Sequence, residues 1–329
     1  MIITKTPYRI SFFGGGSDYP EWYMRNGGAI LSTTIDKYIY LSCRKLPPFF
    51  KHKHRIVWSK VELVNEIKEI KHKAVKEMLN LFKIKDGIEL HYDGDLPARS
   101  GMGSSSCFVV GMMNTLSLLR NKNLSKKKLA EKSIYFEQKI LKETVGSQDQ
   151  IAASYGGFNK INFSSNGNFD VKPIKISQAS ISKLNKNLIL LYTGVQRTAH
   201  RIADTYVRKL KKEKHREIIQ ILEFVKEADK VLKKRNFDDF GRLLHESWLT
   251  KKKLSNKMTN GSLDEIYNLA IKKGALGGKI LGAGGGGFFL LYVPYERQNN
   301  FLKHFTKFVH IPFKFEKSGS KVLFNQKNF

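Results

Sequence analysis

Residues 95–106 read Asp-Leu-Pro-Ala-Arg-Ser-Gly-Met-Gly-Ser-Ser-Ser, and no other stretch of the chain is as informative. The stretch leaves a short strand, crosses a loop of glycine and serine, and opens an apolar helix. Glycines let a backbone approach a ligand closely, and the free amides of Gly103, Ser104 and Ser105 would lie at the positive end of that helix. This predicts an anion site suited to a diphosphate, with serine hydroxyls able to ligate Mg2+. An ordinary serine N-cap is the alternative, but it explains one serine and not the whole run.

A second glycine-rich stretch, Gly282-Ala-Gly-Gly-Gly-Gly287, formally matches the G-x-G-x-x-G pattern. The match is weak, because any run of glycines satisfies it and because the run precedes a strand at 288–293. A dinucleotide-binding turn would follow a strand and open a helix. Five glycines in six positions are more than a flexible turn needs. We therefore expect this backbone to approach a ligand or the first glycine loop. Neither stretch is a Walker A loop, since the Gly-Lys-Ser/Thr ending is missing.

Arg9 lies within residues 1–13, a stretch that alternates weakly and is predicted to be a strand. A buried guanidinium needs an anionic partner, so Arg9 is a candidate functional residue. The run Gly14-Gly-Gly-Ser-Asp18 breaks the strand, and Asp18 either forms an Asx-turn or serves a ligand.

Asp149 is one more acidic candidate. Glu137 lies in a predicted helix, and Asp149 follows it by twelve residues, just before a small apolar segment. A lone aspartate in such a place is more often a helix cap than a catalytic base.

Length and composition narrow the class of protein. The chain has 329 residues, of which 41% are hydrophobic and 12% aromatic, so it can build a sizeable core and is not disordered. At roughly 100–200 residues per domain, two domains are expected. Cys43 and Cys107 are the only cysteines, which excludes a disulfide framework and a cysteine-rich zinc site. The start of the chain lacks a signal-peptide pattern, and the apolar run 288–293 is far below the roughly 18–20 residues of a membrane span. We expect a soluble, cytoplasmic protein.

The charge raises the alternative of a nucleic-acid-binding protein. The formal net charge is +29, and a strongly basic chain is a reason to consider nucleic acid as a partner. However, the basic clusters at 126–128, 208–216, 233–235 and 251–253 lie on segments with the pattern of amphipathic helices. Clusters 126–128 and 251–253 show no interleaved aromatic residues. We interpret these clusters as solvated lysine faces and expect neither a dedicated nucleic-acid function nor a membrane partner.

The pattern of apolar residues predicts an α+β chain. Strands are expected at 1–13, 28–45, 52–59, 87–92, around 158–174, and at 188–193, 288–293 and 321–324. Helices are expected at 61–83, 104–119 and 126–142, and helices dominate 197–273. A boundary is expected near 180–187, where Ser, Lys and Asn collect, which divides the chain into domains 1–185 and 186–329.

Together the segments Pro7–Asp18, Pro97–Ser106 and Lys279–Gly287, with Asp149, resemble the motifs of the GHMP kinase superfamily in their order. The resemblance implies a two-domain fold, with an N-terminal domain like that of ribosomal protein S5 and a C-terminal ferredoxin-like domain. Within the superfamily, residues 9–22, 27–37 and 69–72 are similar to bacterial D-glycero-D-manno-heptose 7-phosphate kinases.

The resemblance also implies roles for single residues. Asp149 would be the catalytic aspartate that orients or deprotonates the attacking hydroxyl. Arg9 would keep Asp149 ionised and offset charge on the transferred phosphoryl group. Mg2+ would be held by Ser105 and Glu137. The residues expected to contact ATP are Pro97, Ser100, Gly101, Met102, Gly103, Ser104, Ser105 and Ser106.

The expected substrate-binding residues are Gly15, Gly16, Ser17, Asp18, Arg99, Gly194, Arg197, Gly285 and Gly286. Galactokinases carry Glu-His where this chain has Gly15-Gly16, so a roomier site and a longer sugar with a distal phosphate are expected. Arg197 is the first candidate for the anchor of that phosphate, with Arg99 and Arg201 as weaker ones, and each of them is equally compatible with a surface position.

The activity implied is transfer of a phosphoryl group from ATP to the anomeric hydroxyl of heptose 7-phosphate, with Mg2+, to give the 1,7-bisphosphate. That product would feed nucleotide-activated heptose for capsule or lipopolysaccharide synthesis. The alternative is another sugar kinase of the superfamily, such as a fucokinase-like enzyme, which would need no phosphate anchor. The sequence leaves the oligomeric state open, with a homodimer as one possibility.

Overall fold

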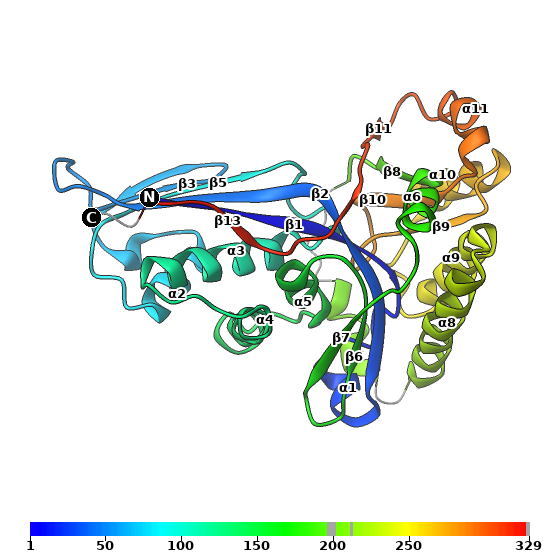
Figure 1. The fold of residues 1–329 in the computed structure, drawn as a ribbon, viewed down its shortest axis with the longest axis horizontal. Helices are drawn as coiled ribbons and strands as arrows, with labels where there is room; N and C mark the ends of the chain where they lie inside the picture. The colour runs from blue at the N-terminus through cyan, green and yellow to red at the C-terminus, as the bar shows by residue number, and fades with distance from the viewer. Residues whose placement is uncertain (196–201, 211–212, 327–329) are drawn as a thin grey trace.

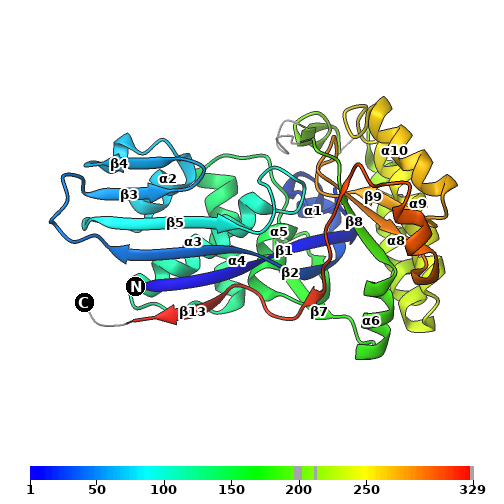
Figure 2. The same ribbon diagram turned by 90° about the horizontal axis from the view of Figure 1, so that it is seen from above.

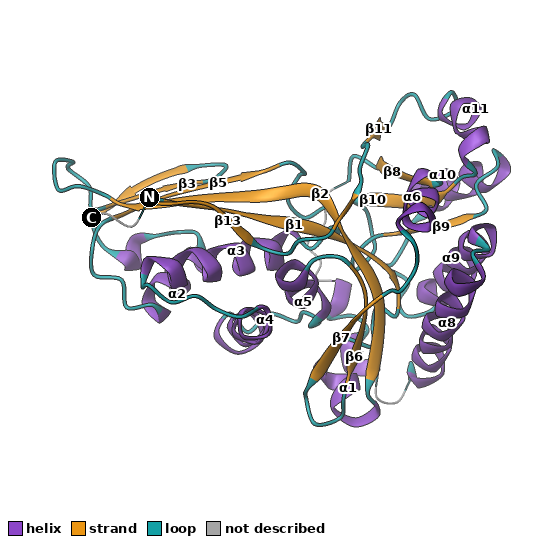
Figure 3. Ribbon diagram, in the orientation of Figure 1, coloured by secondary structure: helices purple, strands orange, loops and turns teal. Residues whose placement is uncertain are grey.

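The structure is a computed structural model that describes residues 1–195, 202–210 and 213–326. Two sheets organise it, and helices pack against each of them (Figures 1 and 3). The larger sheet is built mainly from the first half of the chain and the smaller sheet from the second half. The prediction of an α+β fold is confirmed.

Two long antiparallel strands form the centre of the larger sheet, β1 (Ile2–Phe13) and β2 (Gly28–Lys45). One half of β2 pairs with β5 (Ile88–Gly94) and the other half with β6 (Phe158–Phe163), so β2 joins the two ends of the sheet. The described strands follow the order β13-β1-β2-β5-β3-β4, which Figure 2 shows from above. The remaining strands of this sheet are β3 (His54–Val57), β4 (Val61–Val64), β7 (Phe169–Pro173), β12 (Phe315–Glu316) and β13 (Lys321–Asn325).

Helices cover one face of this sheet, as Figure 1 shows. They are α2 (Lys73–Leu81), α3 (Ser104–Leu119), α4 (Lys126–Tyr135) and α5 (Gln148–Tyr155). Helix α3 packs on β1 and β2 and between its helical neighbours. It is apolar on almost every side because it is buried on almost every side.

The smaller sheet has the strand order β11-β8-β10-β9, and each neighbouring pair is antiparallel. Its strands are β8 (Leu188–Tyr192), β9 (Gly277–Ile280), β10 (Phe288–Tyr292) and β11 (Val309–His310). The long helices of this half are α8 (His215–Lys234), α9 (Phe237–Lys252) and α10 (Gly261–Lys272). Shorter helices occur in both halves: α1 (Pro20–Asn26), α6 (Gln178–Lys186), α11 (Gln298–Leu302), η1 (Ile67–Glu69), η3 (Val207–Lys209) and η4 (Tyr295–Arg297).

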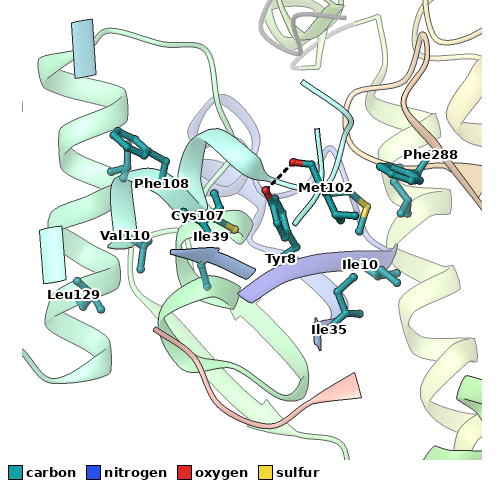
Figure 4. Packing of buried hydrophobic residues seen from close by; sticks show 14 of the residues in the cluster. Tyr8, Ile10, Ile35, Ile39, Met102, Cys107, Phe108, Val110, Leu129 and Phe288 are labelled. Carbon is teal, nitrogen blue, oxygen red and sulfur yellow. Dashed lines mark hydrogen bonds between the residues drawn. The ribbon is translucent and has the colours of Figure 1, made fainter. Parts of the chain in front are cut away.

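One large hydrophobic cluster spans both halves, and two smaller clusters lie beside it in the described part of the chain. At the end of β1, Phe12 and Phe13 meet Phe240 of α9 edge to face, with ring centroids 5.3 and 5.1 Å apart. Figure 4 shows Met102 from the glycine loop and Phe288 from β10 in the same cluster as the side chains of the central strands. This shared core fixes the two halves against each other and therefore fixes any site between them.

One predicted helix is wrong in part. Residues 61–83 were expected to be helical, but 61–64 form strand β4, which pairs with β3, and the helix begins only at Lys73. The reason is tertiary, because backbone partners on β3 outweigh a weak helical pattern in a segment whose Val61 and Leu63 face solvent.

The end of the chain returns to the first sheet. Strand β12 pairs with β2 and β13 pairs with β1, so the last strands lie beside the first (Figure 1). The stretch 180–187, which was expected to hold a boundary, is largely helix α6.

Candidate active site

A cavity of about 300 Å³ brings together residues from every segment that the sequence singled out. Its walls come from β1 and the glycine turn after it, from the loop before α3, from the start of α5, and from the glycine-rich loop before β10. Predicted site residues that line it are Arg9, Gly15, Gly16, Asp18, Arg99, Gly101, Gly103, Ser104, Ser105, Ser106, Asp149 and Gly286.

Arg9 and Asp149 form a two-pronged ion pair at the cavity wall. The guanidinium of Arg9 donates through Nε and Nη2 to the two carboxylate oxygens of Asp149, at 2.7 and 2.8 Å. Its third nitrogen, Nη1, donates to the carbonyl oxygen of Gly101 at 2.8 Å. The Arg9 residue is buried, whereas the Asp149 side chain keeps 21% of its surface exposed. Because a paired fork holds both groups rigidly, the carboxylate faces the cavity in a fixed orientation.

The N-terminus of α3 forms a second wall. The helix begins at Ser104, its N-cap Gly103 has a φ of 76°, and no side chain caps it. The first amides of a helix lack intrahelical partners, and the helix dipole adds partial positive charge there. This end of α3 therefore offers backbone donors to an anion in the cavity, beside the carboxylate of Asp149.

The glycine-rich stretch 282–287 packs directly against the loop before α3. A Cβ on Gly287 would come within 2.1 Å of the carbonyl oxygen of Ser100, and a Cβ on Gly101 within 2.4 Å of that of Leu281. Both glycines also have positive φ, at 93° and 85°. The amide of Phe288 donates to the Ser100 carbonyl at 3.2 Å. Only glycine permits this backbone contact, which joins the two halves of the chain at the cavity.

Asp18 lies on the wall formed by the turn after β1. Its Oδ1 accepts from the amide of Gly16 at 3.0 Å, and the residue is buried against Gly146. Burial raises the pKa of Asp18, and the nearby charge of Asp149 raises it further. At Gly15 a Cβ would meet nothing nearer than 3.9 Å, so the floor there is open.

Glu137 is fully buried behind the α3 wall, in a single π-helical turn, η2 (Phe136–Ile140). Such turns are frequent at functional sites. Its Oε2 accepts from the side chain of Gln150, while Oε1 lacks a hydrogen bond of ordinary geometry in the described structure. Burial raises the pKa of Glu137 to about 8, although the hydroxyl of Ser106 and the amide of Gln150 act against this rise.

This environment fits Mg2+. A carboxylate oxygen without a partner, next to a serine hydroxyl, is the hard oxygen chemistry that Mg2+ prefers. Among the described residues no three acidic, histidine or cysteine side chains gather as a metal cage, but Mg2+ at phosphates usually needs only one or two carboxylates. The serine beside Glu137 is Ser106, whereas the predicted ligand Ser105 is exposed to solvent. The pairing of Ser105 with Glu137 stays a prediction.

The sequence analysis missed two lysines in the cavity. Lys251 and Lys279 line it, with 6% and 3% of their surface exposed. The cluster 251–253 was interpreted as a solvated face, and this is wrong for Lys251. The helical spacing of α9 indicates that Lys251 is buried, because Phe240, Leu244 and Lys251 lie on one buried face of the helix.

Several predicted residues do not line the cavity: Pro97, Ser100, Met102, Ser17, Glu137, Gly194 and Gly285. The side chain of Met102 belongs to the core, so only its backbone can face a ligand. The hydroxyl of Ser17 donates to the backbone of Gly14 and serves the turn. Arg197 and Arg201 lie outside the described residues, and Arg99 is an exposed residue at the cavity.

Comparison with known proteins agrees with this architecture. Residues 65–157 match the family model of the GHMP kinases N terminal domain, and residues 228–309 match that of the GHMP kinases C terminal domain. The chain therefore belongs to the GHMP kinase family, as the motifs predicted. It is an enzyme that transfers a phosphoryl group from ATP.

Single relatives refine the comparison. A D-glycero-alpha-D-manno-heptose 7-phosphate kinase of Campylobacter jejuni is 31% identical, over 97% of this chain and 98% of its own. A bifunctional fucokinase/GDP-fucose pyrophosphorylase of Arabidopsis thaliana is 24% identical, over 87% of this chain and 29% of its own. The crystal structure of a D-glycero-D-manno-heptose 1-phosphate kinase from Bacteroides thetaiotaomicron superposes with a TM-score of 0.80 at 22% identity, over 99% of this chain and all of that one. None of the helices in the described part of the chain is long and apolar enough to cross a membrane.

Proposed function

We propose that this chain phosphorylates the anomeric hydroxyl of D-glycero-D-manno-heptose 7-phosphate, with ATP as donor and the 1,7-bisphosphate as product. The observation that carries the proposal is the Arg9–Asp149 pair, which faces the uncapped end of α3 across one cavity. The choice of sugar is supported by the 31% identical relative, which is named for heptose 7-phosphate.

The donor phosphates would bind at the start of α3. The amides of Ser104, Ser105 and Ser106 would donate to phosphate oxygens, as helix N-termini do for anions. Glu137, with Ser106 or Ser105, would hold Mg2+, which when bound would offset negative charge on the phosphates. Glu137 would then be ionised, because a bound cation favours the carboxylate over the protonated form that burial favours.

Asp149 would act on the acceptor hydroxyl. Its exposed carboxylate would orient the hydroxyl and take up the proton as the oxygen–phosphorus bond forms and the bond from phosphorus to the ADP oxygen breaks. Arg9 holds the carboxylate in place from behind and would offset charge on the transferred group. Such catalysis consists mainly of positioning and electrostatics, because the reaction asks for little covalent chemistry from the protein.

The acceptor would lie against the turn after β1. Asp18 would accept hydrogen bonds from sugar hydroxyls, and the open floor at Gly15 would leave room for a sugar longer than a hexose. We also propose that residues 1–185 and 186–329 act as the N- and C-terminal domains. The last strands, β12 and β13, return to pair with β2 and β1 of the first sheet. The product would feed nucleotide-activated heptose in the cytoplasm.

The test is ATP consumption with a panel of sugars under equal conditions. The panel contains heptose 7-phosphate, heptose 1-phosphate, free heptose, fucose and galactose. We expect kcat/KM for heptose 7-phosphate to exceed that of every other sugar by at least tenfold. Preference for heptose 1-phosphate would retain the kinase but overturn the proposed position of the phosphate. Preference for fucose or another unphosphorylated sugar would overturn the proposed substrate class.

A further inference from the structure

We propose that Lys251, Lys279 and Ser11 form an anion subsite that binds the phosphate carried by the acceptor sugar. The inference rests on the proposed function for the identity of the ligand. It assigns that phosphate to buried groups of the cavity wall in place of Arg99, which is exposed at the cavity; Arg197 lies outside the described residues.

The first argument is that both lysines are buried cations without an ion pair in the described structure. The ammonium of Lys279 donates to the carbonyl oxygen of Phe12 at 2.8 Å, and that of Lys251 donates to the carbonyl oxygen of Gly282. Neither lies within ion-pair distance of a described carboxylate, although Asp18 is near enough to influence both. Burying an ammonium group without a negative counter-charge costs free energy. Both lysines line the same cavity. An anionic ligand there would supply the missing counter-charge.

A serine hydroxyl gives the second argument. Ser11 follows Arg9 by two residues on β1, and both line the cavity, as expected for residues on one face of a strand. The residue is only 5% exposed, and its Oγ has no hydrogen-bond partner in the described part of the chain. A buried hydroxyl normally has a partner, so Ser11 is a further donor available to a ligand in the cavity.

The group reaches the glycine turn, where the acceptor would lie. At the α3 end, Arg9 contacts Gly101 of the loop that would hold the donor phosphates. Lys279 contacts Phe12, three residues further along β1 and next to the glycine turn. At about 3.3 Å per residue, that is about 10 Å from Arg9 along the strand. Lys251 contacts Gly282, whose backbone packs against Gly101, so the group extends from the phosphate loop to the glycine turn. We assign the phosphate that it binds to the acceptor, because a sugar whose reacting hydroxyl lies at Asp149 would place a distal phosphate along this path.

The charges also match. Asp149 neutralises Arg9 through the two-pronged pair, so Arg9 offers little net charge to a second anion. Burial lowers the pKa of both lysines in the empty cavity, and a bound phosphate would favour their positively charged forms. A phosphate monoester carries about −1.5 to −2 near neutral pH. A sugar without a phosphate would give these lysines no counter-charge, so we expect it to bind less tightly than a phosphorylated sugar.

The experiment compares Lys251→Met and Ser11→Ala with the control Lys253→Met, which removes an exposed charge two residues away. With saturating ATP, we expect KM for heptose 7-phosphate to rise about 10- to 100-fold in Lys251→Met and about 3- to 10-fold in Ser11→Ala, as the loss of bonds to a charged group predicts. KM for ATP should change less than threefold, and Lys253→Met should match the wild type. An equal or larger rise in KM for ATP, or no change for either substrate, would overturn the subsite.

A binding measurement separates this inference from the proposed function. Binding of inorganic phosphate is measured by calorimetry with a non-hydrolysable ATP analogue and Mg2+ bound. Phosphate should bind the wild type, and it should bind Lys251→Met at least tenfold more weakly. If phosphate binds the wild type at least tenfold more tightly than Lys251→Met but the wild type does not turn over heptose 7-phosphate, the proposed substrate fails and the anion subsite stands. If wild type turns over heptose 7-phosphate and Lys251→Met binds both phosphate and sugar normally, the subsite fails and the proposed function stands. Ser11→Ala keeps the test valid if Lys251→Met does not fold.

Discussion

Replacing Lys251 by methionine should stabilise the protein while it weakens substrate binding. Burial lowers the pKa of Lys251 to about 8, from an ordinary value of 10.5, and the positive charge of Arg9 lowers it further against the opposing effect of Asp18 and Asp149. At about 1.4 kcal/mol per pH unit, holding this side chain charged in the folded state at pH 7 costs about 3 kcal/mol. Methionine removes the charge and keeps most of the volume. For a chain of this size, about 3 kcal/mol corresponds to a rise in Tm of about 4 °C.

The pH dependence fixes the sign of the effect. The folded-state pKa of Lys251 lies below the unfolded one, so the unfolded chain binds more protons between pH 8 and 10.5. The cost of burial is therefore complete below about pH 8 and disappears as pH rises toward 10.5. The stability advantage of Lys251→Met should follow the same course. The value of 3 kcal/mol is an upper bound, because the variant also removes a cation that favours the buried carboxylate of Asp18.

The assay is denaturant unfolding of the wild type, Lys251→Met and Lys253→Met at pH 7, 8, 9 and 10 without ligands. We expect Lys251→Met to be more stable at pH 7, with a difference that shrinks at each step above pH 8. Lys253→Met should match the wild type throughout, because its ammonium is exposed. A variant less stable than wild type at pH 7, or an advantage that does not depend on pH, would refute the argument.

Three other substitutions test the rest of the site. Asp149→Asn should lower kcat by about 10²- to 10⁴-fold with little change in nucleotide affinity, because it removes the proton acceptor; unchanged turnover would remove Asp149 from the mechanism. Glu137→Gln should raise the Mg2+ concentration needed for half-maximal rate at least tenfold, while Glu131→Gln, which removes a partly exposed carboxylate of α4, should leave it unchanged; an unchanged Mg2+ titration in Glu137→Gln would disprove the proposed ligand. Gly287→Ala should destabilise the fold by more than about 2 kcal/mol in denaturant unfolding, because its Cβ would lie 2.1 Å from the Ser100 carbonyl oxygen at a φ of 93°; wild-type stability would show that the two glycine loops can separate freely.

Much of the site could be predicted from the sequence because its parts are local. A glycine loop that opens an apolar helix predicts an anion site wherever the rest of the chain lies, and residues 101 and 103–106 line the cavity as this pattern requires. An arginine in an apolar strand predicts a buried partner, although the pattern alone does not say that the partner is Asp149. Several strands and helices around these motifs followed from periodicity, but the pairing of β4 with β3 outweighed it at 61–64. Helix α5, which carries Asp149, was not predicted.

The lysines show why the rest could not be predicted. Lys251 is one of three consecutive lysines, and its neighbours Lys252 and Lys253 are partly or fully exposed. Local composition therefore indicates a solvated cluster. The helical spacing of α9 places Lys251 on the buried face, but only the packing of α9 against the glycine loop shows that this face ends in a cavity.

The sequence by itself determined the family, the anion-binding loop and the candidates Arg9 and Asp149, because each depends on residue types at short fixed spacings. Only the tertiary structure decided which charges remain unpaired. Arg9 and Asp149 are separated by 140 residues and neutralise each other, whereas Lys251 and Lys279 come from different elements and meet no described carboxylate. Electrostatic energy depends on distance through space and on burial, and neither is a property of a short stretch of sequence. The preference of the cavity for a second anion is therefore a property of the fold.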